Sequence, residues 1–504
     1  MLNVVINSRV KRVISLLLSG GASDCLLVGG FVRDHFLGLP SKDIDIEVYG
    51  LTYEKIMRIL NRHFQVHFVG QSFGTIKIDN EIDINIPRIE SKSGVGHKGF
   101  DILCDPNLDM YSAFSRRDFT INAIGIHVDG SIYDPFDGIN DINCKILRAT
   151  TVAFCEDPLR VLRGMQFAAR FGFTMESGTV ELCKRVFNEF DILSAERVWG
   201  EWFKWGSKGT ELSRGLFLLQ ETGWIQHFPE LAKLINVTKI QNSNSNSTLN
   251  LNSDSGGKIC GGEDAFVNTA NICDFACKIA DELKFDEDDR LVLIFAALCY
   301  NFGKTEVNAN GNGTGNDLLL QKLSGSISNL KSGTKFPDSV SKSFHFANRF
   351  LDRFKPPLRI VNNVLSLVGE SMTDEFVLGK IVADDNFLRH LAVRLEPSGI
   401  RLWAALCRAV ILANGNNDGN NYGNNDVKNA LIRQVEKCEL RAAELGVIDS
   451  KPKPILQGRD LITRGVNAGR EMGIILDNAY KAQLNGAFKN IDEAISWYEE
   501  IYNS

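Results

Sequence analysis

Two hydrophobic patterns divide this chain of 504 residues. Up to about residue 150, short apolar runs and alternating segments lie between turn signals, and Phe73–Ile78 with Glu81–Ile86 predicts a β-hairpin. From about Thr151, turn signals thin out and apolar residues recur at helical spacing, as in DPLRVLRGMQFAARFGF. The pattern predicts an α+β fold, with strands and helices in the N-terminal part and helices in the remainder.

The segment Leu27–Tyr49 combines a glycine turn with paired carboxylates. Its apolar run ends in Gly29-Gly30, and Arg33 follows on an expected helix. Asp43 and Asp45 stand two apart in an alternating stretch, which puts both side chains on one face of a strand. A glycine turn at a helix N-terminus suits a triphosphate, and neighbouring carboxylates suit a hard cation such as Mg2+. Since the spacing fits one short helix and a turn, the two features are expected to meet in a metal-dependent nucleotidyl transfer site.

A third carboxylate is usual in a two-metal phosphoryl transfer site. Asp83 is the first candidate and Glu81 the second, because both lie on one face of the same expected strand. A charge at a strand edge is the alternative for either residue. The spacing alone does not separate the two.

Two later segments place arginines beside carboxylates. SRRDFTINAIG sets Arg117 next to Asp118 before an apolar helix, where forked guanidinium donors suit a ribose or phosphate. In CEDPLRVLRGMQF, Asp157 is the expected N-cap of a helix, and Arg160 and Arg163 share one helical face. Taken alone, each segment also suits a solvated or capped helix start. The candidate nucleotide-binding residues are Gly29, Gly30, Arg33, Arg117, Asp118, Glu156, Asp157, Arg160 and Arg163.

Composition adds limits on location and partners. The net charge is -6, so any RNA binding must come from a local basic surface, and no apolar run reaches the roughly 18 residues of a membrane span. The apolar N-terminus suits an amphipathic helix better than a signal peptide, because an expected strand follows within a few residues. Eleven scattered cysteines without zinc spacing predict a reducing, cytoplasmic compartment.

Three Asn-rich stretches interrupt the helical part, at Asn242–Gly257, Asn308–Asp317 and Asn414–Asp426. Their composition buries too little apolar surface to offset the entropy of ordering. They are expected to be disordered surface insertions.

The order GGFVRD, KDIDIE, RRDFTINA, DPFDGINDI, EDPLRVLRGMQFAARFGF and SAERVWGEW closely resembles the class II nucleotidyltransferases. These comprise bacterial-type CCA-adding tRNA nucleotidyltransferases and related poly(A) polymerases. The resemblance runs from about residue 20 to 235 and resumes in Pro454–Phe488. It implies a polymerase-β-like head (1–150), an all-α neck with a base-reading motif (151–237), a body (263–375) and a tail (376–504), with insertions at 238–262 and 414–426.

The resemblance also implies roles for the candidate residues. Asp43 and Asp45 would hold Mg2+, and Gly30, Arg33 and Arg117 would contact the incoming nucleotide. The RNA 3′-hydroxyl would attack the α-phosphate in line, and pyrophosphate would leave.

In the neck, the resemblance implies that Asp157 and Arg160 read the base of CTP or ATP and that Arg163 binds the triphosphate. Some relatives carry a further arginine three residues later, where this chain has Gln166, so that contact is in doubt.

The body departs from the family pattern. Many relatives carry an HD-type metal centre, but Asn268 and Asn271 stand where histidines are expected, and Tyr300 and Asn301 replace His-Asp. Asn and Tyr are poor ligands beside imidazole and carboxylate. We therefore expect an HD-like scaffold whose phosphohydrolase activity is lost.

Several functions stay open at this point. Addition of CCA to tRNA from CTP and ATP leads, because no extra arginine-rich element follows the paired-carboxylate strand as in poly(A) polymerases. A poly(A) polymerase, a partial CC- or A-adding enzyme and a non-catalytic RNA-binding protein are the alternatives. The long helical half argues against transfer to a small molecule. Arg353, Lys355 and Arg359 are either an RNA contact or an ordinary solvated face, the latter being favoured, and neither a membrane nor a protein partner is predicted.

Overall fold

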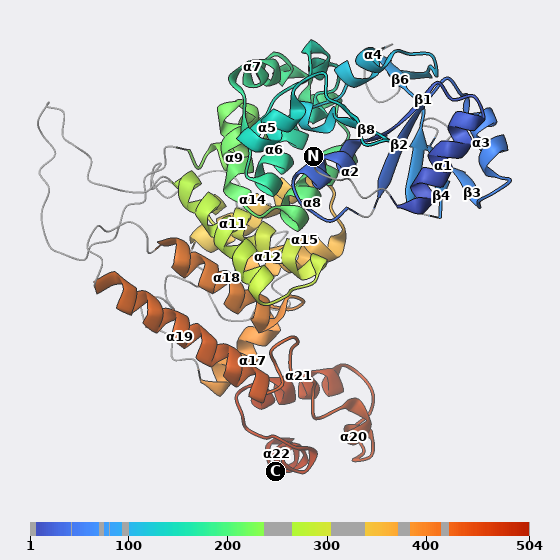
Figure 1. Cartoon of the computed structure of the whole chain (residues 1–504). Helices are drawn as coiled ribbons and strands as arrows, with labels where there is room; N and C mark the ends of the chain where they lie inside the picture. Colours follow the sequence, from blue (N-terminus) through green and yellow to red (C-terminus); the bar gives the residue numbers. More distant parts are fainter. Residues whose placement is uncertain are drawn as a thin grey trace, which may run out of the picture. The chain divides into compact units, whose positions relative to one another are not determined.

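The computed structural model describes residues 7–41, 43–69, 75–79, 81–92, 100–235, 265–303, 338–370, 384–414 and 423–502. The chain forms two compact units, Met1–His227 and Phe228–Ser504, each described by itself (Figure 1). Named strands occur in the first unit, and the described part of the second unit is helical. The predicted α+β fold, a mixed-sheet head followed by helices, is therefore confirmed, whereas the finer division into neck, body and tail stays a prediction.

A seven-stranded mixed sheet organises the first unit, in the order β3-β4-β5-β2-β1-β8-β9. Its strands are β1 (Asp24–Val28), β2 (Ile44–Tyr49), β3 (Val66–Val69), β4 (Thr75–Ile78), β5 (Ile82–Asn85), β8 (Gly125–His127) and β9 (Ile132–Tyr133). β2 runs antiparallel to β1 and parallel to β5. The antiparallel pairing of β4 with β5 confirms the predicted hairpin. Two small sheets pair β6 (Arg88–Lys92) with β7 (Phe100–Cys104) and β10 (Ile146–Leu147) with β11 (Thr174–Met175).

Nine α-helices and four 3-10 helices complete the described part of the first unit. They are α1 (Ser8–Ser19), α2 (Gly29–Phe36), α3 (Tyr53–Leu60), α4 (Met110–Ser115), η1 (Thr120–Asn122), α5 (Gly138–Cys144), η2 (Val152–Glu156), α6 (Leu159–Phe171), α7 (Ser177–Arg185), η3 (Phe187–Ile192), α8 (Ala195–Lys208), α9 (Leu212–Glu221) and η4 (Trp224–His227). α1 buries Val10, Val13, Ile14 and Leu17 along one side, as expected for an amphipathic first helix.

Helix α6 is held between α8 and α9. A side chain at Gly215 of α9 would lie 2.7 Å from the Met165 carbonyl oxygen, so only glycine allows this close approach. On the α8 side, Trp202 and Trp205 are fully buried. This packing fixes α6, and with it the orientation of Arg160 and Arg163.

The described helices of the second unit are α10 (Pro229–Ala232), α11 (Ala265–Glu282), α12 (Glu287–Cys299), α14 (Asp338–Asp352), α15 (Leu358–Gly369), α17 (Asp385–Arg394), α18 (Gly399–Asn414), α19 (Gly423–Glu444), α20 (Gly458–Ile462), α21 (Arg470–Leu484) and α22 (Ile491–Tyr502). α12 packs against α11, α15 and α18, and buries every residue from Leu291 to Cys299. α20, α21 and α22 share a separate small core around Leu461, Ile475 and Tyr498. Among the helices described, none is both long and apolar enough to cross a membrane.

The structure corrects one of the three expected insertions. Asn242–Gly257 and Asn308–Asp317 lie outside the described residues, and so do residues 415–422 of the third stretch. Asn414, however, ends α18, and Gly423–Asp426 form the first turn of α19. The helical pattern of the following segment extends backwards into the stretch, and Asp426 is favourably placed near the positive end of the helix dipole.

Candidate nucleotidyl transfer site

A cleft of about 570 Å3 lies in the first unit. Its walls come from the β1–α2 turn, β2, the segment around Arg117, and helices α6 and α8. Ten lining residues are arginine or lysine and five are aspartate or glutamate. A chain with a net charge of -6 therefore concentrates positive charge at this cleft, as anionic substrates require.

The β1–α2 turn meets the paired carboxylates directly. β1 and β2 pair in the register Val28↔Asp45, and α2 begins at Gly29. Gly29 has a φ of +70°, and a Cβ there would lie 3.1 Å from Oδ2 of Asp45. Glycine is therefore needed both for the backbone conformation and for the approach. The structure thus brings the glycine turn and Asp45 together, as the spacing predicts.

Asp45 lies in an environment that disfavours its negative charge, as expected where a cation binds. Asp43 immediately precedes β2 and is exposed, whereas Asp45 lies within the strand and lines the cleft. Burial, followed by the charges of Asp83 and Asp43, raises the pKa of Asp45 to about 6. A divalent cation with oxygen ligands would relieve this repulsion, so the donor set fits Mg2+.

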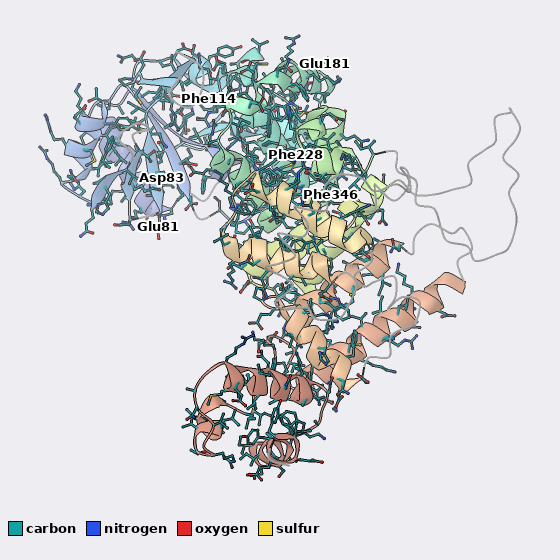
Figure 2. All side chains as sticks on the ribbon, turned by 180° about the vertical axis from the view of Figure 1, so that it is seen from behind. Glu81, Asp83, Phe114, Glu181, Phe228 and Phe346 are labelled. Carbon is teal, nitrogen blue, oxygen red and sulfur yellow. The ribbon has the colours of Figure 1, made fainter. Side chains whose placement is uncertain are left out.

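Asp83 lies beside Asp45 but does not present a free carboxylate. The parallel register of β2 and β5 sets Asp45 opposite Asp83. Nζ of Lys77 donates to both carboxylate oxygens of Asp83, at 2.6 and 2.7 Å. Glu81 is exposed, 3.9 Å from the guanidinium of Arg9 (Figure 2). Among the described residues, no three His, Cys, Asp or Glu side chains could hold a metal, so the structure gives no support to Asp83 or Glu81 as a third ligand.

Glu47 is a cleft residue that the sequence analysis missed. It lies two residues after Asp45 on β2 and lines the same cleft. Its carboxylate accepts hydrogen bonds from the Arg117 guanidinium at 2.9 Å and from the Tyr49 hydroxyl. Strand alternation, the pattern that pairs Asp43 with Asp45, extends to Glu47 and could have found it.

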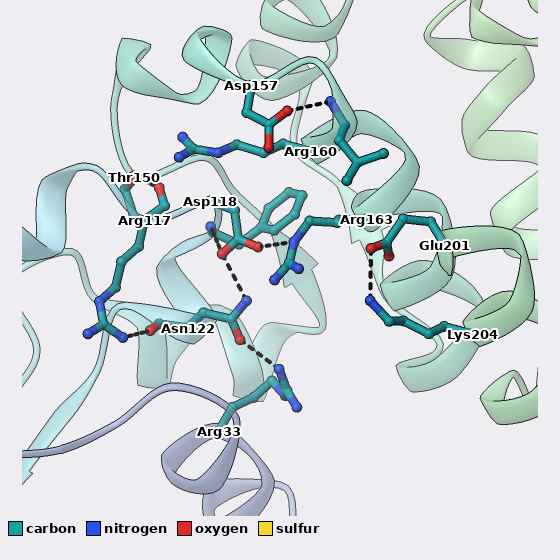
Figure 3. A network of polar contacts seen from close by, with 12 residues as sticks. Arg33, Arg117, Asp118, Asn122, Thr150, Asp157, Arg160, Arg163, Glu201 and Lys204 are labelled. Atoms are coloured by element: carbon teal, nitrogen blue, oxygen red, sulfur yellow. Dashed lines mark hydrogen bonds and ion pairs between the residues drawn. The ribbon is translucent and has the colours of Figure 1, made fainter. Parts of the chain in front are cut away.

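Asp118 and Asn122 connect the candidate arginines (Figure 3). Asp118 Oδ2 accepts from Arg163 Nε at 2.7 Å, and Oδ1 accepts from the Asn122 amide at 2.9 Å. Asn122 Oδ1 in turn accepts from Arg33 at 2.7 Å. Burial alone would raise the pKa of Asp118, but Arg163, the Asn122 amide and Arg160 outweigh burial and lower this pKa to about 2. Asp118 is therefore a fixed negative charge, and Asn122 is a second missed residue.

Arg33 is buried rather than extended into solvent. Its guanidinium lies over the rings of Phe167 and Phe171, at 5.2 and 4.8 Å from their centres, and donates to Asp34. Burial lowers the pKa of Arg33, and Asp34 opposes this effect. Arg33 lines the cleft, and its orientation is fixed by Asp34, Asn122 and the two phenylalanine rings.

The base-reading candidates lie at the start of α6. Asp157 accepts from the Leu159 backbone N–H at 3.1 Å and from Arg197 at 2.6 Å. Pro158, and not Asp157, stands at the N-cap position of α6, but the Asp157 carboxylate still accepts from the first backbone N–H of the helix. Arg197 of α8 was missed, because only tertiary packing reveals its contact with Asp157.

Arg160 is anchored to the backbone. Its two terminal nitrogens donate to the carbonyl oxygens of Ala153 and Arg116, both at 2.8 Å. Glu156 pairs with the Arg116 guanidinium at 2.7 Å. A guanidinium has five N–H donors, so Arg160 keeps further donors for a ligand.

In the second unit, neutral side chains occupy the segment where a metal centre was considered. Asn268, Thr269 and Asn301 are fully buried. The Asn301 amide donates to Thr269 Oγ1 at 2.8 Å and to Asn268 Oδ1 at 3.2 Å. Asn268 donates to Asn414 at 3.0 Å. The segment is a hydrogen-bonded amide network, and Lys304 lies outside the described residues.

The basic cluster near Arg353 is largely neutralised. Arg353 donates to both carboxylate oxygens of Glu230, at 2.6 and 2.8 Å. Arg359 pairs with Asp288 at 2.6 Å on the surface. The structure favours an ordinary ion-paired face here over an RNA contact.

The glycine turn, the paired carboxylates and the arginine network lie around one cleft, as a nucleotidyltransferase head would require. In agreement, residues 25–148 match the family model described as the poly A polymerase head domain. The matched residues cover the sheet and the β1–α2 turn of the first unit, so this part of the chain is similar to that head domain. The multifunctional CCA protein of Nitrosomonas europaea is 40% identical over 214 residues, which are 42% of this chain and 50% of that protein. The chain spans about half the length of the curated relatives it matches.

Solved structures show the same fold along nearly the whole chain. The Bacillus stearothermophilus CCA-adding enzyme in complex with CTP is similar over 98% of both chains, with a TM-score of 0.58 and 20% identity. The Thermotoga maritima CCA-adding enzyme complexed with tRNA covers 98% of this chain and 97% of its own, with a TM-score of 0.53 and 16% identity. The fold is therefore that of CCA-adding enzymes.

Proposed function

We propose that this protein adds CMP and AMP to the 3′ end of tRNA without a nucleic-acid template, releasing pyrophosphate. The observation that carries the proposal is the meeting of Gly29 and Asp45 at a cleft whose other walls hold Asp118, Arg163 and Asp157. Similarity to multifunctional CCA proteins supports it. The cytoplasm, where tRNA and both nucleotides are present, is the expected location. In the described part of the chain every cysteine is free, in keeping with a reducing compartment.

Within this function, Asp43 and Asp45 would hold Mg2+, which when bound offsets the charge of the α-phosphate and the attacking oxygen. The backbone N–H groups at the start of α2 and the guanidinium of Arg163 would bind the triphosphate. Arg117, held by Glu47 and the Asn122 carbonyl, faces the same space and would contact the ribose or phosphates.

Base choice would depend on Asp157 and Arg160. The Asp157 carboxylate, fixed by Arg197, can accept from the exocyclic amino group that cytosine and adenine share, and Arg160 can donate to a ring nitrogen or carbonyl. Arg160 already binds two backbone carbonyls, so a modest exchange of these bonds would adapt it to either base.

We also propose that the second unit has no HD-type phosphohydrolase activity. Its buried Asn268, Thr269 and Asn301 are hydrogen-bonded to one another and provide neither imidazole nor carboxylate ligands.

The deciding experiment incubates the protein with tRNA that lacks its CCA end, labelled CTP and ATP, and Mg2+. Addition of two C residues and then one A is expected. Long A tails without C incorporation would indicate a poly(A) polymerase instead, and addition of C or A alone would indicate a partial enzyme. RNA binding without incorporation would contradict any transferase function.

A further inference from the structure

Two cleft lysines lie outside the nucleotide site described above. Lys204 and Lys208, on α8, line the cleft with Arg163 of α6. α8 runs alongside α6 in the same direction, because Arg197 meets Asp157 where both helices begin. Where they end, Thr210 donates to the Ala169 carbonyl at 3.0 Å. Lys204 and Lys208 therefore lie about 10 and 16 Å beyond Arg197 along the helix, on the triphosphate side of the base-reading residues.

A buried carboxylate holds the first of these lysines. Glu201 is 3% exposed, and its Oε1 accepts from Lys204 Nζ at 2.8 Å. Its other oxygen, Oε2, is buried and has no hydrogen-bond partner among the described residues. Figure 3 shows Glu201 between Arg163 and Lys204, and the charges of Asp118 and then Glu201 raise the pKa of Arg163.

Burying a carboxylate with only one of its oxygens hydrogen-bonded costs free energy. A purely structural role therefore does not explain Glu201 well. The residue does, however, hold a flexible lysine side chain at the edge of the cleft. Lys204 uses one of its three donors on Glu201 and keeps the others for a ligand. Lys208 is exposed four residues later on the same face of α8.

We propose that Lys204 and Lys208 bind a phosphate group of a substrate in the cleft, with Glu201 as the positioning residue for Lys204. This inference rests on the proposed function, which brings two phosphate-bearing substrates to this site. The phosphate belongs either to the nucleotide triphosphate or to the RNA backbone near its 3′ end. Both sources present acceptors only, which match the donor-only ammonium groups.

The test measures binding, without Mg2+, of labelled ATP and of tRNA lacking its CCA end to wild type, Lys204→Gln, Lys208→Gln and the double variant. The double variant should bind one of the two ligands about tenfold more weakly. If that ligand is tRNA, the slope of log affinity against log salt should fall by about 0.7 for each lost phosphate contact. If it is ATP, the phosphate is that of the triphosphate. Unchanged binding of both ligands overturns the proposal.

Lys184→Gln is the matched control. Lys184 forms an i,i+3 pair with Glu181, also at 2.8 Å, on the exposed side of α7 and outside the cleft (Figure 2). Its variant should bind both ligands normally. Glu201→Gln should weaken the same ligand less than Lys204→Gln does, and combining the two should add nothing further. Additive losses would contradict the positioning role. Because binding is measured apart from incorporation, a protein that binds normally but adds no nucleotide refutes the proposed function and not this site.

Discussion

The two polar clusters of this chain are built from opposite kinds of groups. In the first unit, Arg33, Asp118 and Arg163 form a charged network along an open cleft. In the second unit, Asn268, Thr269 and Asn301 form a neutral network at 0% exposure. Burying a charge costs free energy, so buried charges occur where they are paired or bind a ligand. Amides that bond to one another can be buried without a ligand.

The charged cluster has the properties of a functional site, whereas the neutral cluster has those of a packed scaffold. In the cleft along which the charged cluster lies, one carboxylate, Asp118, has its pKa lowered to about 2, and another, Asp45, has its pKa raised to about 6. Carboxylates driven in opposite directions within one cleft are typical of functional sites. The neutral cluster contains no titratable group, and its polarity serves packing. Four predictions test this contrast.

The largest effect is expected from Asp45→Asn. The amide keeps the shape of the side chain but removes a charge that the metal requires, so incorporation of CMP and AMP should fall by at least ~10³-fold. Incorporation is measured on tRNA lacking its CCA end, with tRNA affinity measured in parallel as the control. Affinity should stay close to that of wild type. Substantial incorporation by the variant would remove Asp45, and with it the cleft, from the chemistry.

Asp118→Ala should destabilise the first unit by about 2 kcal/mol, because it leaves the partly buried Arg163 and the buried Asn122 amide without their acceptor. Urea unfolding followed by the fluorescence of the buried tryptophans Trp202, Trp205 and Trp224 measures the loss. Asp118→Asn retains an acceptor and should lose less. Equal stability of Asp118→Ala and wild type would mean that the charged network is not structurally coupled.

The sequence predicted the parts of this contrast that depend on local pattern. The glycines before a helix and the alternating carboxylates predicted that Gly29 and Asp45 meet. The two alternating segments Phe73–Ile78 and Glu81–Ile86 predicted the hairpin of β4 with β5. The same hairpin sets Lys77 opposite Asp83, so its register could have shown that Asp83 is neutralised.

Other contacts depended on packing between segments far apart in the chain. Arg197 meets Asp157 forty residues away, and Lys204 reaches the cleft only because α8 lies along α6. Helical spacing shows which residues of one helix share a face, but it does not show which other helix packs beside that face. The alternative of a capped helix start was also right for Asp157, but a capped helix can still line a site.

Asn301→Asp tests whether the neutral network of the second unit tolerates a charge. The new carboxylate would be buried beside the neutral Asn268 and Thr269, so the second unit should lose about 2 kcal/mol. Thermal melting with Mn2+ or with EDTA measures both the loss and any metal binding. The loss should be the same in either solution, and incorporation should be unaffected. Stabilisation by Mn2+ would show that a metal site remains latent in this network.

The smallest effect concerns the stability cost of Asp45 itself. Its folded pKa of about 6 exceeds the ordinary value of 3.8, so folding favours the protonated form. Relative to Asp45→Asn, wild type should therefore lose stability as pH rises from about 4 to 6, and the variant should be more stable by about 1 kcal/mol at pH 8 in EDTA. Melting at pH 5 and pH 8 checks the sign, since the stability advantage of the variant must shrink at the lower pH.

Mg2+ should stabilise wild type at pH 8 and leave the variant unchanged, because only wild type keeps both carboxylates. A variant less stable than wild type at pH 8 in EDTA would show that Asp45 is not held against repulsion, and the electrostatic contrast between the two clusters would then disappear.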